Sequence, residues 1–231
     1  MIKVEKLNSK REFRDFVKFQ FKHFENNPYW VPPVISEELE VFDPDKNPAY
    51  KQADASFFMA YKDGKAVGRI AAIINWLEVK EQKKPKIRFG WFDAVDDLGV
   101  TKALLAEVEE IGREHGLKFM EGPVGFSNMD KAGMLVEGFE ELNTMITWYN
   151  YPYYKEHFNK LGFEKENEWV EYKITIPQEG PSEKVKKFSE LIMKRNNLHI
   201  IRFKEKKEVL GYADEMFNLL NATYSKLSTF V

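Results

Sequence analysis

The sequence lacks cysteine, lacks a long apolar run and lacks an excess of charge of either sign. Without cysteine the chain can form neither a disulfide nor a thiolate metal site, which favours a reducing compartment. The N-terminus is charged where a signal peptide needs an apolar stretch, and the longest apolar run, near residues 70–77, is far shorter than the roughly 20 residues of a membrane helix. These absences predict a cytoplasmic protein.

Charge and ring content narrow the class of protein further. The 35 Lys and Arg residues against 37 Asp and Glu give a formal net charge of −2. This balance argues against a nucleic-acid or membrane-surface protein, because such proteins bind through clustered basic charge. Aromatic residues, by contrast, make up 15% of the 231 residues. Rings fill cores and also line ligand clefts, and composition does not choose between the two.

Local patterns predict most of the regular elements. Ser9 and Glu12 have the spacing of a capping box, and phenylalanines at helical spacing follow, which predicts a helix over about residues 10–24. Five of the ten prolines lie between residues 28 and 50, so we expect an ordered extended segment there. Asp63-Gly64 between apolar runs predicts a hairpin. Similar patterns predict three strands, at 87–95, 119–124 and 169–176. They also predict two helices, at 101–115 and 151–161, and Gly116 is expected to end the first of these helices.

The C-terminal quarter repeats the pattern with which the chain begins. Residues 177–182 have the composition of a linker, and a helix (183–195), a strand (199–203) and a helix (208–227) are predicted after it. Either this tail packs on the first domain, or it opens a second domain that the chain does not complete. We favour the second interpretation because a strand needs partners. The expected division is a domain over 1–176, and a linker with the opening strand and helix of a second unit over 177–231.

The order of elements predicts an α/β (α+β) fold, with a mixed, mainly antiparallel sheet and helices on both faces. This order, with DGKAVGRI at 63–70 and Leu-Gly-Phe at 161–163, resembles the GNAT superfamily of acyl-CoA-dependent N-acyltransferases. More narrowly, ENNPYWVPP, FDPDKNP, GRIAAIIN and GPVGFSN resemble uncharacterised bacterial GNAT-like proteins built from two such domains. The resemblance covers about residues 1–176.

That resemblance implies transfer of an acyl group from acetyl-CoA or another acyl-CoA to an amine, without a metal. The expected partners are a small-molecule amine and a second GNAT-like domain, in the same chain or in a homodimer. No nucleic acid or membrane is expected.

The superfamily holds the CoA pyrophosphate on backbone N–H groups at the start of a helix. The resemblance implies that six residues hold the cofactor here: Ala94, Val95, Leu98, Gly99, Val100 and Thr101. The segment 93–101 departs from the family in having one glycine and three aspartates, and carboxylates such as Asp96 and Asp97 also favour helix N-termini. The segment is therefore either a modified CoA-binding loop or the capped start of a structural helix, and both interpretations stay open.

The acid and the base of the reaction are less well marked. Phe158 stands where the superfamily often has a tyrosine that protonates the thiolate. Tyr154 lies one turn earlier on the same side of the predicted helix. It either replaces the family's tyrosine as the acid or is a tyrosine of the core. Glu121 lies in an otherwise apolar predicted strand and is the candidate general base. The alternative is that its side chain simply faces water. Asp93 is a further carboxylate, but two neighbouring aspartates prevent a single assignment.

Residues 125–150 form an unusually long connection. Ser127 and Asn128 within it, and Tyr29 and Trp30 in the proline-rich segment, are candidates for substrate contacts. Three further rings, Trp148, Tyr149 and Tyr151, are candidates for lining an aromatic pocket, or the segment is a satellite core.

The leading expectation is an N-acyltransferase acting on an unidentified amine. The alternative is a non-catalytic GNAT-like domain that binds a ligand or supports a partner catalytic domain, which the acidic loop and Phe158 favour. A third is a dimerising scaffold with residues 29–33 at the interface.

Overall fold

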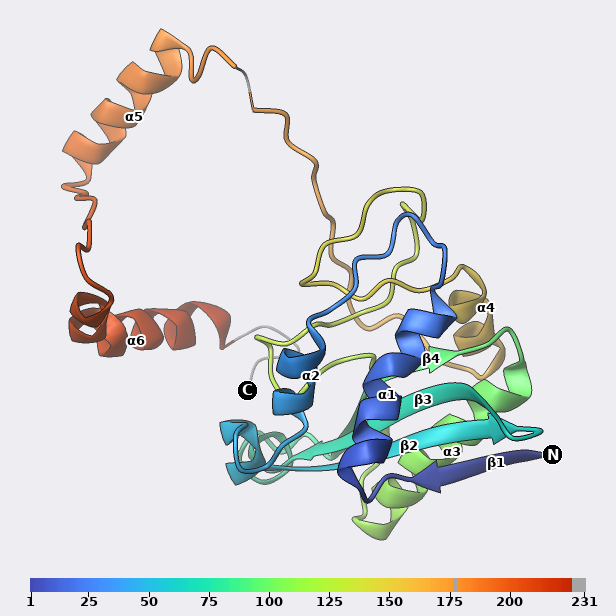
Figure 1. Cartoon of the computed structure of the whole chain (residues 1–231). Helices are drawn as coiled ribbons and strands as arrows, with labels where there is room; N and C mark the ends of the chain where they lie inside the picture. The colour runs from blue at the N-terminus through green and yellow to red at the C-terminus, as the bar shows by residue number, and fades with distance from the viewer. Residues whose placement is uncertain (177, 226–231) are drawn as a thin grey trace. The chain divides into compact units, whose positions relative to one another are not determined.

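The computed structural model describes residues 1–176 and 178–225 (Figure 1). The chain divides into two compact units, the first spanning Met1–Glu166 and the second beginning at Asn167. Among the described residues, no helix has both the length and the apolar character needed to cross a membrane.

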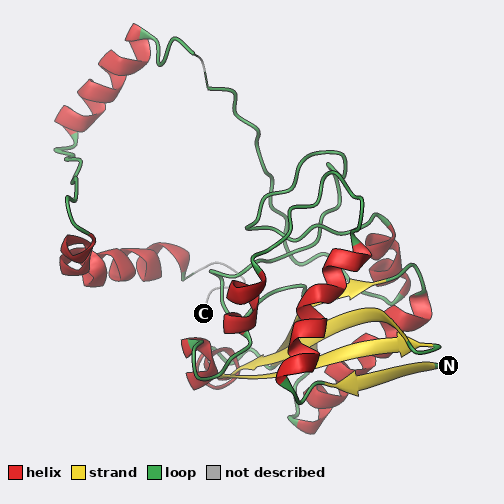
Figure 2. Ribbon diagram, viewed as in Figure 1, coloured by secondary structure: helices red, strands yellow, loops and turns green. Residues whose placement is uncertain are grey.

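The first unit is built on a five-stranded sheet in the order β1-β2-β3-β4-β5 (Figure 2). The strands are β1 (Ile2–Lys6), β2 (Ala53–Lys62), β3 (Lys65–Asn75), β4 (Lys86–Ala94) and β5 (Phe119–Glu121). Neighbouring strands are antiparallel except β4 and β5, which are parallel. The predicted fold class is confirmed.

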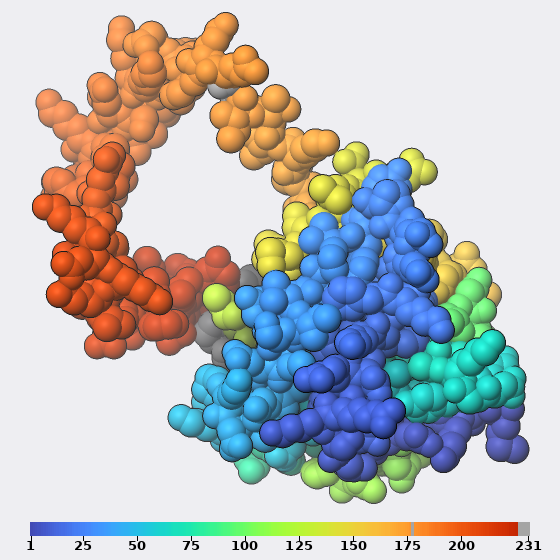
Figure 3. Space-filling view, viewed as in Figure 1, coloured from blue at the N-terminus to red at the C-terminus, as the bar shows by residue number. Residues whose placement is uncertain are grey.

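Helices cover both faces of this sheet (Figure 1). They are α1 (Lys10–His23), α2 (Ile35–Val41), the 3-10 turn η1 (Pro48–Lys51), the π-helical turn η2 (Leu77–Glu81), α3 (Leu98–Glu114) and α4 (Tyr153–Lys160). On one face Phe16 of α1 packs in a core with Phe57 and Trp91. On the other, α3 and α4 pack in a core with Phe89. The side chains of this unit form one closely packed body (Figure 3).

Local signals placed several elements correctly. Both halves of the capping box at Ser9 and Glu12 form, and α1 starts where predicted. The hairpin turns at Asp63 and Gly64, whose φ angles are 52° and 75°, and Gly116 has the positive φ of 68° expected at a helix end. Helix α3 begins one turn earlier than predicted because Asp97 caps it, with its side chain accepting the Gly99 N–H.

Other predictions were incomplete within the first unit. Strand β1 was not predicted, and α2 forms in the proline-rich segment because Ile35–Val41 contains no proline. Strand β5 ends at Glu121, since the next two residues, Gly122 and Pro123, do not continue a ladder.

The second unit departs more from expectation. The predicted strands at 169–176 and 199–203 do not form in the described part of the chain. Val170, Tyr172 and Ile174 alternate as a strand requires, but they are 65%, 81% and 80% exposed, because no described segment pairs with them.

Helical segments of the second unit lie near where they were predicted. They are α5 (Glu183–Arg195), the 3-10 turn η3 (Lys206–Tyr212) and α6 (Ala213–Tyr224), and none contains a buried residue. Residues 226 and 227 of the predicted last helix lie outside the described residues. Phe188 and Leu191 of α5 are about 60% exposed, so the apolar stripe of this helix is uncovered.

Gly90 lets the backbone after β5 approach β4. A Cβ at this position would lie 2.4 Å from the carbonyl oxygen of Val124. We therefore expect Gly90→Ala to lower the free energy of unfolding by about 1–3 kcal/mol, as overpacking does. Urea unfolding followed by tryptophan fluorescence measures this. Gly211→Ala, where the added methyl meets open space, is the matched control, and equal stabilities of the two variants would contradict the prediction.

Candidate active site

Strand β4 is the centre of the candidate site. It is buried along its whole length, and a bulge interrupts it at Trp91, whose φ is 45° and where the pairing with β3 shifts register. Bulges re-aim the side chains that follow them. Charged side chains form one buried cluster before the bulge and another after it.

The cluster after the bulge contains the ion pair of Arg69 and Asp93. Nε of Arg69 lies 2.7 Å from the Asp93 carboxylate, and the two side chains are only 2% and 6% exposed. The guanidinium also donates to the Phe16 carbonyl at 2.9 Å and lies over the Phe16 ring. The pair thus connects β3, β4 and α1.

Tyr154 brings α4 to the same cluster. Its hydroxyl accepts the Ala94 N–H at 3.1 Å, donates to Oδ1 of Asp93 at 3.3 Å and lies 3.0 Å from Nε2 of His23. Its neighbour Tyr153 donates to the Ala94 carbonyl at 2.7 Å. Both backbone groups of Ala94, a residue expected to hold the cofactor, are therefore bonded to side chains of α4.

Burial controls the ionisation of the tyrosine and the histidine. It raises the pKa of Tyr154 well above its usual value, and the Asp93 carboxylate raises that pKa further. Burial also lowers the pKa of His23, with Asp93 opposing and Arg69 adding to this effect. Near pH 7 both side chains are therefore neutral.

The cluster before the bulge surrounds the fully buried Glu78. Its carboxylate lies 2.7 Å from Nε of Arg88 and 2.9 Å from Nζ of Lys86, and Lys86 also pairs with Glu121. Burial raises the pKa of Glu78, but the two cations outweigh it and leave that pKa below its usual value. Arg88 donates to the carbonyls of residues 125 and 126, so the cluster anchors the start of the long connection.

The structure does not bring the two predicted catalytic residues together. Glu121 pairs in register with Arg88, whereas Tyr154 contacts Ala94, six residues further along β4. At about 3.3 Å per residue the two backbone positions that they contact are up to roughly 20 Å apart along β4. The carboxylate that Tyr154 does contact is Asp93.

At the start of α3, carboxylates meet the positions expected to bind phosphates. Asp97 accepts the Gly99 N–H at 2.9 Å and pairs with Lys62 at 2.8 Å, which lowers the pKa of its carboxyl. Asp97 is thus a helix cap, one of the two interpretations of this stretch. Gly99 itself is exposed and Leu98 half-buried.

Beside this cap, hydrogen bonds of His157 link Asp96 to Thr101. Nε2 of His157 lies 3.2 Å from Asp96, and its Nδ1 lies 2.8 Å from the hydroxyl of the buried Thr101. Val100 is also buried, and Val95 donates its N–H to β3. No group of His, Asp and Glu side chains among the described residues is arranged to hold a metal.

The aromatic substrate candidates are partly brought together. Trp30, Tyr149 and Tyr151 pack around Phe24, with ring centroids 5.3–5.5 Å from its own. Trp148 packs instead on Trp91. The cluster around Phe24 thus joins the end of α1 to the segment before α4.

Two of the remaining substrate candidates, Tyr29 and Ser127, accept hydrogen bonds from backbone N–H groups of the long connection. The Tyr29 carbonyl accepts the Asn143 N–H at 2.8 Å, and the Ser127 hydroxyl accepts the Met129 N–H at 3.2 Å. Asn128, next to Ser127, is half-buried.

A groove of about 590 Å³ lies elsewhere in this unit. Leu105 and Arg113 of α3, Phe119 and Met120 of β5 and Phe163 are among its walls. It borders Ile87 near the start of β4, whereas Tyr154 contacts the end of that strand.

Sequence reasoning gave no role to Arg69, Arg88, Glu78 and His23. A signal was present for the two arginines, since each is the single basic residue inside an otherwise apolar strand pattern. Buried arginines are almost always paired, so each one implied a carboxylate partner.

The buried His23 predicts a pH-dependent stability. Because its pKa is lowered on folding, the unfolded chain binds a proton that the folded chain does not, so stability falls as pH drops below about 6.5. We expect His23→Gln to remove this component, while carboxylates titrate alike in both proteins. Thermal unfolding between pH 5 and 8 measures it, with the exposed His115→Gln as control. Parallel stability curves for wild type and His23→Gln would contradict the prediction.

Comparison with known proteins places these features among relatives. No family model matches the chain. Protein YghO of Escherichia coli is 28% identical over 213 residues, which cover 91% of this chain and 54% of the relative. Bacterial ceramide synthase of Caulobacter vibrioides is 26% identical over 163 residues, covering 70% of this chain and 42% of the relative. The chain thus spans about half the length of the curated relatives it matches.

Solved structures similar to this chain are acetyltransferases. A predicted acetyltransferase with acetyl-CoA from Clostridium acetobutylicum has 13% identity and a TM-score of 0.44, covering 75% of this chain and 96% of that one. A tandem GNAT protein from the clavulanic acid biosynthesis pathway has 17% identity and a TM-score of 0.39, covering 50% of this chain and 34% of that one. Similarities at this level of sequence identity and TM-score do not define the reaction that a protein catalyses. The solved structures to which this chain is similar thus include GNAT proteins, the superfamily that its sequence motifs resemble.

Proposed function

We propose that this chain is part of an acyl-CoA-dependent N-acyltransferase that acts on an amine carrying a long aliphatic chain. The observation that carries the proposal is the similarity to bacterial ceramide synthase over 70% of this chain. A ceramide is the amide of a fatty acid and a long-chain amino alcohol, so its formation is acyl transfer to an amine. The GNAT-like motifs of the sequence support the same chemistry.

In this proposal the acyl donor lies at the end of β4. Residues 94, 95 and 98–101 contact it, and the Tyr153 hydroxyl releases the Ala94 carbonyl as it binds. The amine attacks the thioester carbonyl and the carbon–sulfur bond breaks. The amine proton passes to Asp93, Tyr154 protonates the leaving thiolate, and Asp93 returns a proton to the tyrosine across 3.3 Å.

Ser127 and Asn128 of the long connection, with Tyr29 and Trp30, are proposed to face the acceptor. The cluster of rings around Phe24 supports an apolar acceptor, since rings offer area to an aliphatic chain.

A second candidate is a non-catalytic domain that supports a catalytic partner domain, in the same chain or in a second copy. The occupied backbone of Ala94 and the Asp97 cap favour it. In either case we propose that residues 1–176 are one GNAT-like domain and that the segment from 177 opens a second unit. The uncovered apolar stripe of α5 supports that division.

Calorimetric titration with acetyl-CoA and with a long-chain acyl-CoA separates the two functions, followed by transfer to a long-chain amino alcohol. We expect micromolar binding and an amide product detected by mass spectrometry. Absence of both binding and product would leave the supporting domain as the function.

Glu121 and Asp93 compete for the role of base, and Glu121→Gln decides between them. Because Lys86 already pairs Glu121 and Tyr154 is distant, we expect the variant to keep more than about a tenth of the wild-type kcat, whereas loss of a general base costs about 10²–10⁴-fold. The same assay measures it. An inactive but folded Glu121→Gln protein would return the role to Glu121.

Asp97 is expected to weaken donor binding, because its carboxylate holds an N–H group that a pyrophosphate needs. Asp97→Gly, alone and with Asp96→Gly, should bind acetyl-CoA several-fold more tightly in calorimetry. Replacing an Asp cap by Gly costs little more than a few tenths of a kcal/mol, so the helix persists. Unchanged affinity would show that the carboxylates do not block the site.

A further inference from the structure

The Tyr154 hydroxyl has three partners, which fixes the position of its proton. A hydroxyl has one hydrogen to donate and two lone pairs to accept with. The Ala94 N–H at 3.1 Å takes one lone pair. In its ion pair with Arg69, the Asp93 carboxylate accepts hydrogen bonds and donates none, so the tyrosine hydrogen points to Oδ1 of Asp93 at 3.3 Å.

His23 completes the arrangement. With the tyrosine hydrogen committed to Asp93, the remaining lone pair accepts the third contact, which requires a hydrogen on Nε2 of His23, 3.0 Å away. All three contacts are then satisfied together. If His23 carried its hydrogen on Nδ1 instead, Tyr154 would have to donate to Nε2, and two oxygens would face each other without a hydrogen between them.

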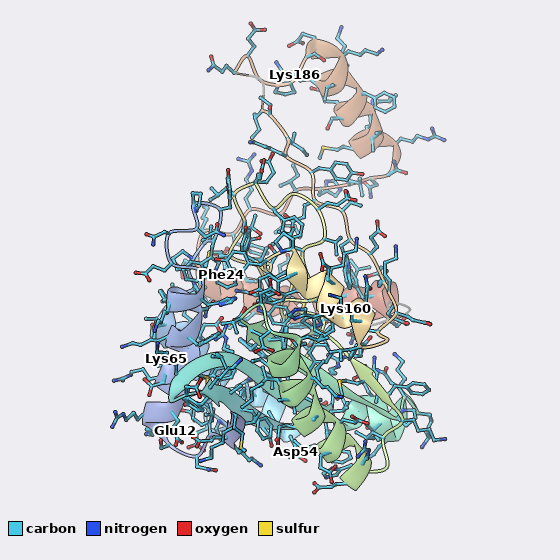
Figure 4. All side chains as sticks on the ribbon, turned by 90° about the vertical axis from the view of Figure 1, so that its right-hand side faces the viewer. Glu12, Phe24, Asp54, Lys65, Lys160 and Lys186 are labelled. Atoms are coloured by element: carbon cyan, nitrogen blue, oxygen red, sulfur yellow. The ribbon has the colours of Figure 1, made fainter. Side chains whose placement is uncertain are left out.

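The elements that meet here are held independently of this contact. The Tyr151 hydroxyl donates to the His23 carbonyl at 3.2 Å, and the rings of His23 and Tyr151 pack at 5.3 Å. The Phe19 ring stacks on the imidazole from within α1. Phe24, which follows α1, and Lys160, the last residue of α4, both lie on the upper side of the sheet in Figure 4. The imidazole is thus clamped with Nε2 directed at Tyr154.

We propose that His23 is a positioning residue for acyl transfer: its Nε2–H and the Ala94 N–H form a two-donor cradle for the Tyr154 oxygen, which directs the tyrosine hydrogen to Asp93. This inference rests on the proposed function. The cradle stabilises the negative charge that develops on the oxygen when Tyr154 protonates the leaving thiolate, in the manner of an oxyanion hole. Uptake of the amine proton turns Asp93 from an acceptor into a donor, which frees the tyrosine hydrogen for the thiolate sulfur. Asp93 then gives its proton to the tyrosine oxygen, so the proton balance closes without a proton from His23.

The charges around His23 bear on the pH at which the cradle works. Asp93 on β4 and Arg69 on β3 face the imidazole with opposite effects on its pKa, and burial lowers that pKa. From α4 and the segment before it, the groups are the hydroxyls of Tyr154 and Tyr151. When the imidazole gains a proton in acid, it places a cation beside Asp93 and the Tyr154 hydroxyl.

Nitrogen-15 NMR of the histidine rings in the full chain tests the hydrogen-bond assignment without any substrate. We expect His23 to be neutral and in the Nε2–H tautomer at pH 7.5, and Tyr154→Phe to reduce that preference. An Nδ1–H tautomer in the wild type, or an unchanged tautomer in Tyr154→Phe, overturns the proposal. Because this readout needs no turnover, it stands if no acyl transfer is found, in which case the proposed function fails separately.

Kinetics test the positioning role. His23→Gln keeps an N–H donor that does not titrate, and we expect it to retain kcat near neutral pH while losing the acid limb of the wild-type pH profile. His23→Phe has no donor and should lower kcat by about tenfold or more with little change in KM. His115→Gln is the matched control, expected to behave as the wild type. Equal kcat for the Gln and Phe variants, or the same acid limb in all four proteins, overturns the proposal.

Discussion

The buried ion pair of Arg69 and Asp93 is the constraint on which the first unit depends. Two charges removed from water are expensive, and the cost is met only when every remaining donor and acceptor has a partner. The Phe16 carbonyl takes a further guanidinium hydrogen and Tyr154 donates to the carboxylate. The pair therefore fixes α1 and α4 against β3 and β4, and losing one partner would cost about 3–5 kcal/mol.

The bulge at Trp91 separates this pair from the second buried cluster, and the side chains at the two ends of β4 contact different parts of the fold. Before the bulge, Glu78 and Arg88 hold the start of the long connection, and Lys86 binds Glu121 into the same cluster. After it, the polar groups converge on the Tyr154 hydroxyl. A carboxylate in an apolar strand was a reasonable sequence signal for a base, but it did not show which end of the strand holds the tyrosine.

Local signals account for the elements that were predicted well, because caps and turns are decided by neighbours in sequence. The capping box at Ser9 and the Asp63-Gly64 turn are of this kind. Strand prediction fails where pairing decides: residues 169–176 alternate correctly but have no partner in the described chain, and β1 forms because β2 accepts it.

The sequence by itself determined the α/β class, the start of α1, the β2–β3 hairpin, the family resemblance and the acidic character of the α3 start, since each follows from residue type and short-range spacing. Only the tertiary structure decided that Lys62 pairs with Asp97, that Lys86 pairs with Glu121 and that His23 meets Tyr154. The last contact joins residues 131 positions apart, and no pattern in the sequence encodes it, because it exists only once α1 and α4 pack at the same end of β4.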